Sequence, residues 1–198
     1  APLVVEDATV GLLVVGGQDM GTEVLQVFTA FARRAAADPD VKAVAPMIQG
    51  QVMLVWGDAV RGALLSGVDP ALEPSVSDVA AHLAGAPIEA LAPGEFGIVL
   101  GRELAHALAV EPGDRITLVA PQGNLTPAGV VPRLKQFRVL ATFYSGHFEF
   151  DSALALVNLS DAQRFLRLDA PTAVRLRLQD MQQAPEVAAR LTAALGPR

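Results

Sequence analysis

The residues best suited to chemistry form the motif H-F-E-F-D at positions 147–151. In an extended chain alternate side chains point the same way, so His147, Glu149 and Asp151 would share one face. An imidazole with two carboxylates can bind zinc or act as an acid and base. Three ligands so close along one strand would need a fourth group and a bend that the sequence does not supply. We therefore interpret the trio as a solvated strand edge or a junction between subdomains, and predict no metal, no cofactor and no catalytic residue.

Two further patterns resemble catalytic or phosphate-binding motifs without matching them. Ser145 lies in Y-S-G-H, which is not the G-x-S-x-G motif of serine hydrolases. The stretch V-V-G-G-Q-D-M-G at 14–21 has the position of a phosphate loop, between a predicted strand and a predicted helix. Its glycines fit neither G-x-G-x-x-G nor G-x-x-x-x-G-K-[ST]. The chain also has no cysteine, which excludes thiol catalysis and zinc-thiolate sites. These patterns indicate a protein that is not an enzyme.

Composition restricts the class of partner. The 198 residues carry a net charge of −6, which argues against nucleic acid because its binding proteins present basic patches to phosphates. The chain is 52% apolar with a mean hydropathy of +0.38, yet no run approaches the roughly 18–20 apolar residues of a membrane span. It begins at Ala1 and shows no signal peptide, so we expect a processed chain or an excised soluble region.

A long segment between two predicted strands is the strongest candidate for binding. The strands R-I-T-L-V (115–119) and R-V-L-A-T-F (138–143) are separated by P-Q-G-N-L-T-P-A-G-V-V-P-R-L-K-Q-F, residues 121–137. Hairpin connections usually have about two to five residues, and much longer ones in compact domains are usually functional. The segment contains three prolines, each of which fixes φ and removes an N–H donor. Residues 115–148 include four bases and no acid. We call residues 121–137 the arm.

The arm has two interpretations. It is a flexible surface hairpin, or it is a pre-stiffened binding element with apolar anchors and a basic rim. Such stiffness reduces the conformational entropy lost on docking, and a few apolar anchors then carry most of the affinity. The apolar positions Val130, Val131, Leu134 and Phe137 favour the second interpretation.

Hydrophobic periodicity predicts an α+β fold. The expected elements are strands at 8–15 and 41–68 (paired around Gly57-Asp58), a helix around 24–35, a loop-rich stretch at 69–94, a strand at 96–101, a helix at 102–109, a strand at 154–159, a helix with Ser160 and Gln163 as a capping box, a strand at 172–178 and a helix from Pro185 to Gly196. We predict two subdomains, with helices covering a sheet built from residues 1–68 and 149–198, and with 69–148 as an inserted lobe. We expect no single sheet to run through both.

Several motifs in a fixed order resemble the periplasmic domain of the lipoprotein-releasing ABC transporter permeases, the LolC/LolE family. They are D-V-K-A-V-A-P (40–46), L-L-S-G-V-D-P (64–70), G-I-V-L-G-R-E-L-A-H-A-L-A-V-E-P-G-D-R-I-T-L-V-A-P (97–121), L-T-P-A-G-V-V-P-R-L-K-Q-F-R-V-L-A-T-F (125–143) and F-E-F-D-S-A-L-A-L-V-N-L-S-D-A-Q-R-F-L-R-L (148–168). The similarity spans about Asp40 to Arg177. The segment around 97–121 is shared with the wider MacB-like permeases, and the arm narrows the resemblance to the Lol type.

The resemblance implies an architecture and a location. The domain would lie between the first and second transmembrane helices of a permease, at the periplasmic face of the inner membrane. Its chain ends would form the subdomain called Porter, and the insertion the one called Sabre. A separate LolD-type ATPase would hydrolyse ATP beside a second permease subunit. This chain would therefore not be an enzyme.

The resemblance also implies a partner for the arm. In LolC-type members this hairpin is the hook, which recruits the chaperone LolA so that lipoprotein cargo passes to it for the outer membrane. Here the hook residues would be Pro121, Leu125, Thr126, Pro127, Ala128, Gly129, Val130, Val131, Pro132, Arg133, Leu134, Lys135 and Phe137.

Two hook positions depart from the family pattern, and other functions stay open. Ala128 replaces a larger apolar residue and Val130 replaces an arginine, so the basic role would pass to Arg133 or Lys135. The resemblance does not separate a LolC-type subunit from a hybrid that serves both LolC and LolE roles. The alternatives are a MacB-like permease for efflux or cell division, and a stand-alone ligand-binding or hydrolytic domain that uses His147 and Glu149.

Overall fold

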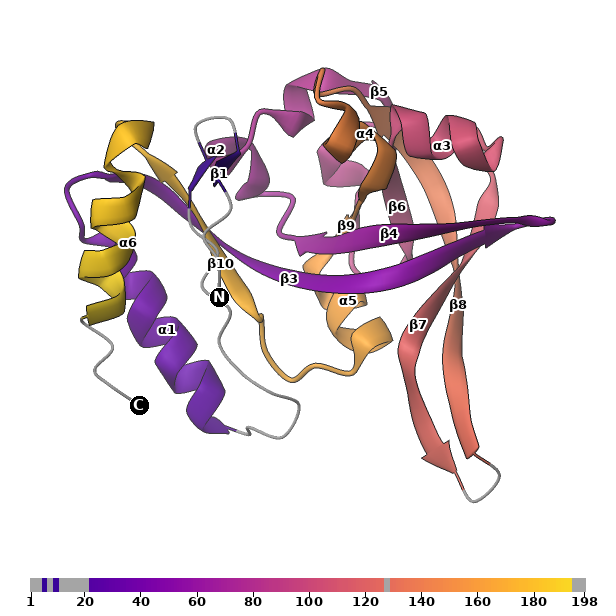
Figure 1. Cartoon of the computed structure of the whole chain (residues 1–198), viewed down its shortest axis with the longest axis horizontal. Helices are drawn as coiled ribbons and strands as arrows, with labels where there is room; N and C mark the ends of the chain where they lie inside the picture. The colour runs from indigo at the N-terminus through magenta and orange to yellow at the C-terminus, as the bar shows by residue number, and fades with distance from the viewer. Residues whose placement is uncertain (1–4, 7–8, 11–21, 127–128, 194–198) are drawn as a thin grey trace.

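The computed structural model describes residues 5–6, 9–10, 22–126 and 129–193, with side chains described for 29–120 and 132–193 (Figure 1). The helices are α1 (Thr22–Ala36), α2 (Glu73–Val76), α3 (Arg102–Leu108), α4 (Phe148–Ala153), α5 (Leu159–Leu166) and α6 (Ala184–Ala193). Short 3₁₀ turns are η1 (Val79–His82), η2 (Ile88–Ala90) and η3 (Met181–Gln183). The protein is therefore mixed α and β, as predicted.

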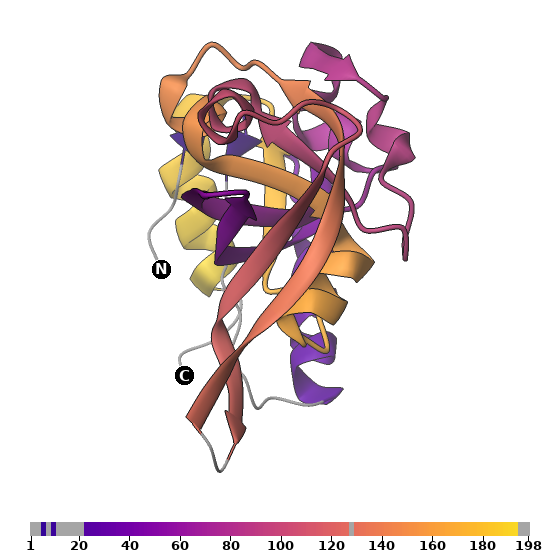
Figure 2. The ribbon, with the colours of Figure 1, turned by 90° about the vertical axis from the view of Figure 1, so that its right-hand side faces the viewer.

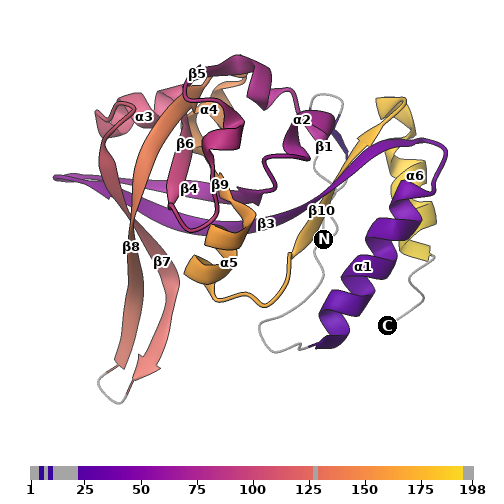
Figure 3. The same ribbon diagram turned by 180° about the vertical axis from the view of Figure 1, so that it is seen from behind.

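The ten strands of the described residues form one mixed sheet. Its order is β1 (Val5–Glu6), β2 (Thr9–Val10), β10 (Ala173–Leu178), β3 (Val41–Trp56), β4 (Ala59–Val68), β9 (Leu154–Asn158), β6 (Gly97–Gly101), β8 (Gly129–Phe143) and β5 (Leu83–Gly85), while β7 (Arg115–Thr126) pairs with β3 and β8. The long strand β3 connects the two ends of the molecule (Figures 1 and 3). It pairs with β10 over residues 41–47 and with β7 over 53–55.

The expectation that no sheet runs through both predicted subdomains is wrong. Strands from 69–148 pair directly with strands from the chain ends, as β6 does with β9 and β7 does with β3. The reason is the length of β3, which exceeds that of either neighbour and so offers separate stretches of one edge to two partners. The boundaries at 68 and 149 themselves stay a prediction.

The apolar core is divided into three clusters, and the division between them differs from the predicted boundary between subdomains. Phe31 of α1, Leu176 of β10 and Leu191 of α6 belong to one cluster formed by the chain ends. A second cluster joins residues of β3 and β4, such as Leu54, to residues of β6, β7 and α5. A third lies around Phe143. Packing thus separates the end helices and β10 from the rest of the molecule, and both larger clusters contact β3.

Most predicted elements of the body are confirmed. Gly57 has a φ of +55° while Asp58 is not among the residues with positive φ, as a type II′ turn requires. In β10 the side chains at 174, 176 and 178 are buried, and those of the two arginines between them are half-buried. Of the strand predicted at 8–15, Thr9–Val10 is described; the glycines at 16, 17 and 21 and the helix end at Gly196 lie outside the described residues.

Two local predictions are wrong. Residues 148–153 form α4, so the motif at 147–151 is not an extended strand edge. The helix α5 begins at Leu159, and its N-cap is Asn158, whose Oδ1 accepts a hydrogen bond from Ser160 N at 2.9 Å. Asn158 also donates from Nδ2 to Leu91 O at 2.7 Å. An asparagine is as good an N-cap as a serine, so Ser160 and Gln163 do not form the predicted box.

Candidate functional site: a projecting hairpin

The arm is part of a long antiparallel hairpin formed by β7 and β8. Paired residues run from Arg115 with Arg138 to Thr126 with Gly129, and the connection at 127–128 lies outside the described residues. The distal half extends away from the helices and from the rest of the sheet (Figures 1 and 2). The expectation that the strands end at 119 and begin at 138 is therefore wrong, while the arm does form a protruding hairpin.

Pro121 and Pro132 fit this hairpin because the ladder is interrupted beside them. Its register shifts between Ala120 and Asn124, where Ala120 pairs with Arg133 and Asn124 with Val131. Pro121 and Pro132 both fall in this interruption and form none of the pairs. Proline is tolerated at such irregularities because no N–H is needed there.

The root of the hairpin is part of the hydrophobic core. Ile116, Leu118 and Phe137 are all at most 1% exposed. The ring of Phe137 packs edge-on against Phe96 and Phe165, at centroid distances of 5.4 and 5.7 Å. The predicted contact of Phe137 with a partner is therefore wrong for this structure, because its side chain is enclosed.

The two bases of the predicted rim turn back toward the body. Arg133 donates from Nη1 to Phe165 O at 3.4 Å, and its Nε is buried without a partner among the described residues. Burial lowers the pKa of Arg133, and the charge of Arg167 acts in the same direction. Lys135 places Nζ 3.9 Å from the centroid of the Phe96 ring, a cation–π contact. Both bases therefore help to fix the root.

For the other predicted hook residues, the structure describes the side chains of Pro132 and Leu134 only. Pro132 is exposed, and Leu134 is 63% exposed, the second-highest value among the large apolar side chains described as exposed. Pro121, Leu125, Thr126, Gly129, Val130 and Val131 lie in β7 and β8, but their side chains are outside the described residues, as are Pro127 and Ala128 altogether.

An apolar row that was not predicted from the sequence lies beside the root. Register places Met53 opposite Val119, and Val119 opposite Leu134. Directly opposed residues on neighbouring strands share a face of the sheet. Met53 is 42% exposed, and Val60 on the adjacent strand is 49% exposed. Apolar residues at alternate positions of β3 were visible in the sequence. Because both faces of this strand are apolar, the pattern did not show which face is exposed.

The motif at 147–151 has a structural role that the helix explains. Asp151 is 1% exposed and its carboxylate accepts hydrogen bonds from Ser145 N at 2.8 Å, Ser145 Oγ at 2.9 Å and Gly146 N at 3.2 Å. It thereby closes the turn that leads into α4. No group of three His, Cys, Asp or Glu residues in the described part of the chain could hold a metal ion.

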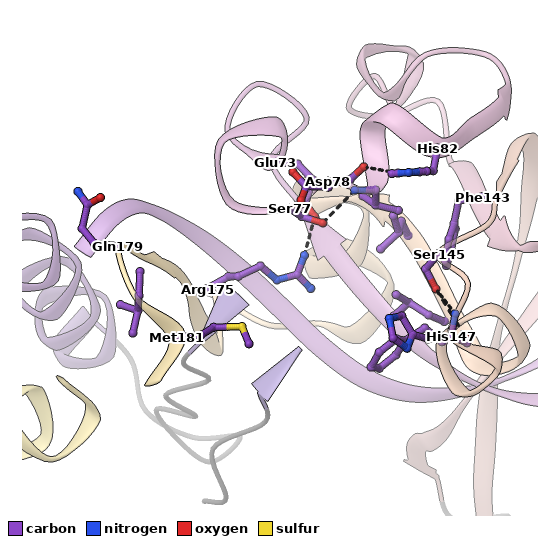
Figure 4. Close-up of a pocket in the computed structure, with 15 residues that line it drawn as sticks. Glu73, Ser77, Asp78, His82, Phe143, Ser145, His147, Arg175, Gln179 and Met181 are labelled. Atoms are coloured by element: carbon purple, nitrogen blue, oxygen red, sulfur yellow. Dashed lines mark hydrogen bonds and ion pairs between the residues drawn. The ribbon is translucent and has the colours of Figure 1, made fainter. Parts of the chain in front are cut away.

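A cleft of about 660 Å³ lies under residues 73–82, between β10 and the loop before α4 (Figure 4). The buried Glu73 accepts a hydrogen bond from Arg175 at 2.5 Å on one side of it. Burial raises the pKa of the Glu73 carboxyl, although the charge of Arg175 and hydrogen bonds from Ser77 and Arg175 act in the opposite direction. Asp78 pairs with Arg177 at 3.1 Å. The cleft was not predicted from the sequence because its residues come from three separate stretches, 73–82, 143–156 and 175–181.

The chain is similar to proteins of known families. Residues 5–194 match the family described as MacB-like periplasmic core domain. The chain is 41% identical to the lipoprotein-releasing system transmembrane protein LolC of Neisseria meningitidis over 152 residues, 76% of this chain and 37% of that protein. It is 41% identical to LolC of Xylella fastidiosa over 164 residues, 82% of this chain and 40% of that protein. The chain thus spans about two fifths of the curated relatives that it matches.

Two solved structures share the fold. The extracellular domain of the ABC-type transporter YknZ from Gram-positive bacteria has a TM-score of 0.57 at 12% identity, over 96% of both chains. The periplasmic region of MacB from Actinobacillus actinomycetemcomitans has a TM-score of 0.55 at 14% identity, over 96% of this chain and 85% of that one. No helix among the described residues is long and apolar enough to cross a membrane.

Proposed function

The chain belongs to the MacB-like periplasmic core domain family, and from this premise we propose that it is the periplasmic domain of a lipoprotein-releasing permease. In this proposal the domain lies at the periplasmic face of the inner membrane, between two transmembrane helices. A separate LolD-type subunit hydrolyses ATP, and a second permease subunit completes the transporter. The identity of 41% to two LolC proteins over most of the chain supports the Lol type over other MacB-like permeases.

The role of the domain is to recruit LolA through the hook, the distal hairpin at 121–134. The observation that carries this role is the projection of that hairpin from a root buried in the core (Figure 2). An element anchored in this way presents its tip without any rearrangement of the body. Its interrupted ladder with two prolines limits backbone freedom, which lowers the entropy lost on binding.

Lipoprotein cargo would then be transferred to LolA while the chaperone is held beside the permease. The domain contributes position rather than chemistry, because the hydrolytic step belongs to the ATPase subunit. The proposed contact is limited to residues 121–134, and Phe137 is left out of it because its buried side chain holds the root.

A binding measurement tests this function. Purified domain and LolA from the same organism should form a complex in isothermal titration calorimetry, and the periplasmic region of MacB, which shares the fold at 14% identity, is the control. Binding of LolA by both domains would show that the fold alone attracts the chaperone. Absence of binding by this domain would favour another MacB-like permease.

A further inference from the structure

The cleft beneath residues 73–82 lies where two of the apolar clusters face each other. Leu178 belongs to the cluster of the chain ends, whereas Phe143 and Leu156 belong to the cluster around β6 and β9, and all three line the cleft. Val79 and Met181 extend its apolar lining. Met181 is 40% exposed, so its side chain lies at the mouth. The volume of about 660 Å³ falls within the roughly 300–1,000 Å³ of small-molecule sites.

In the cleft, the carboxylates have cationic partners, whereas the guanidinium of Arg175 has more hydrogen-bond donors than acceptors. Glu73 is 2% exposed and is held by Arg175, and Asp78 is held by Arg177, so each carboxylate already has a cationic partner. A guanidinium carries several N–H donors in a planar fork. Among the described residues, Glu73 is the one acceptor within hydrogen-bond distance of Arg175.

The remaining donors of Arg175 are open to the cleft. Its other nitrogens are not among the buried atoms that lack a partner, and its side chain is 14% exposed. Since Arg175 lines the cleft and extends from β10 toward Glu73 (Figure 4), this exposure is toward the cleft. The cleft thus combines an apolar wall with unused cationic donors, which is the complement of an apolar chain that carries an anion.

We propose that this cleft binds an amphiphile, with its apolar chain between the two clusters and a carboxylate or phosphate head group on Arg175. The site is separate from the hook and does not depend on LolA. A neutral head group would leave the donors of Arg175 without a charged acceptor. A buried polar group in a cleft with a perturbed pKa is also a general mark of a binding site.

Calorimetry with a matched set of probes tests the choice of head group. The intact domain is titrated with dodecanoate, dodecyl phosphate, dodecanol and dodecyltrimethylammonium, each below its micellar concentration. We expect saturable binding of one anionic probe per chain, about tenfold or more tighter than dodecanol, because hydrogen bonds to charged groups are strong. Comparison of the two anionic probes identifies whether carboxylate or phosphate is preferred. Equal affinity for all head groups, or no saturable binding, would overturn the proposal.

Three variants locate the site. Met181→Trp fills the mouth and should weaken binding of every probe, whereas Val60→Trp adds the same side chain at an exposed position outside the cleft and should change nothing. The double variant Glu73→Gln with Arg175→Gln avoids an unpaired buried charge. It should reduce the preference for dodecanoate over dodecanol to about twofold or less. Circular dichroism confirms that each variant is folded, and unchanged dodecanoate binding in a folded Met181→Trp or double variant would contradict the assignment.

Discussion

The root and the distal half of the β7–β8 hairpin use the same two strands for different purposes. In the root, side chains at 116, 118 and 137 are buried among β3, β6 and α5, and the bases at 133 and 135 turn back onto the same surface. Beyond the ladder interruption at 121–123 the hairpin leaves the body (Figure 2). Under the proposed function, stability and recognition would thus be separated along one pair of strands.

The largest effect on stability is expected at the root. Phe137→Ala should lower the free energy of unfolding by about 3–5 kcal/mol, because it leaves a cavity between Phe96 and Phe165. Urea denaturation measures this change. At temperatures where the variant is still folded, its affinity for LolA should stay close to that of the unchanged domain. A loss of LolA affinity in the folded variant, with little change in stability, would reverse the roles of root and hook.

A charge in the hook should act on binding alone. Val131→Asp should weaken LolA binding by about 2 kcal/mol or more, because it places an unpaired charge in a contact that excludes water. Its thermal midpoint should hardly change. Val130→Asp is the matched variant, since neighbouring residues of a strand point to opposite faces. Unequal losses would identify the face that LolA contacts, and two variants that both bind normally would remove residues 130 and 131 from the interface.

The base at Lys135 should contribute mainly to the root. Lys135→Ala should lower stability by about 0.5–1 kcal/mol through the lost contact with the Phe96 ring. Lys135→Met keeps most of the aliphatic stem and removes the charge, so the difference between the two variants separates packing from cation–π attraction. If Lys135→Ala changes LolA binding, it should lower the association rate constant and make that rate less sensitive to salt. A faster dissociation would instead place Lys135 inside the interface.

The smallest effect is expected at the ladder interruption. Pro132→Gly should weaken LolA binding by about 0.4–1 kcal/mol, because it returns backbone freedom to the hook. Alanine restricts the backbone more than glycine and less than proline, so the LolA affinity of Pro132→Ala should lie between those of Pro132→Gly and the unchanged domain. Stopped-flow or calorimetric affinities for the three proteins resolve this order. If Pro132→Gly binds LolA as tightly as the unchanged domain does, stiffness of the hook has no role in affinity.

The sequence indicated a projecting hairpin but not how far its ladder extends. Prolines normally end strands, and nothing local shows that Pro121 and Pro132 would fall together in one interruption of the register. The enclosure of Phe137 depends on Phe96 and Phe165, which are distant along the chain. Turn and helix signals such as Gly57-Asp58 were readable because they depend on neighbouring residues only.

Long-range pairing and burial account for the other differences. The continuous sheet follows from β3 pairing with both β10 and β7, a choice between distant partners that periodicity does not encode. Asp151 has the side chain of a metal ligand, and its role in closing a turn is set by the burial of α4 against its neighbours. The cleft likewise requires α2, β10 and the loop at 143–147 to meet in space.

The most direct test removes residues 121–132, the part of the hook beyond the paired residues Ala120 and Arg133, while keeping the root. Replacement of residues 121–132 by Asn-Gly joins the paired residues Ala120 and Arg133 through a two-residue turn that suits a hairpin. The account predicts that this variant no longer binds LolA in calorimetry, while its thermal midpoint stays within a few degrees because the buried root is unchanged. Undiminished LolA affinity in the folded variant would contradict the central claim, and unfolding of the variant would show that the distal hairpin is a structural brace.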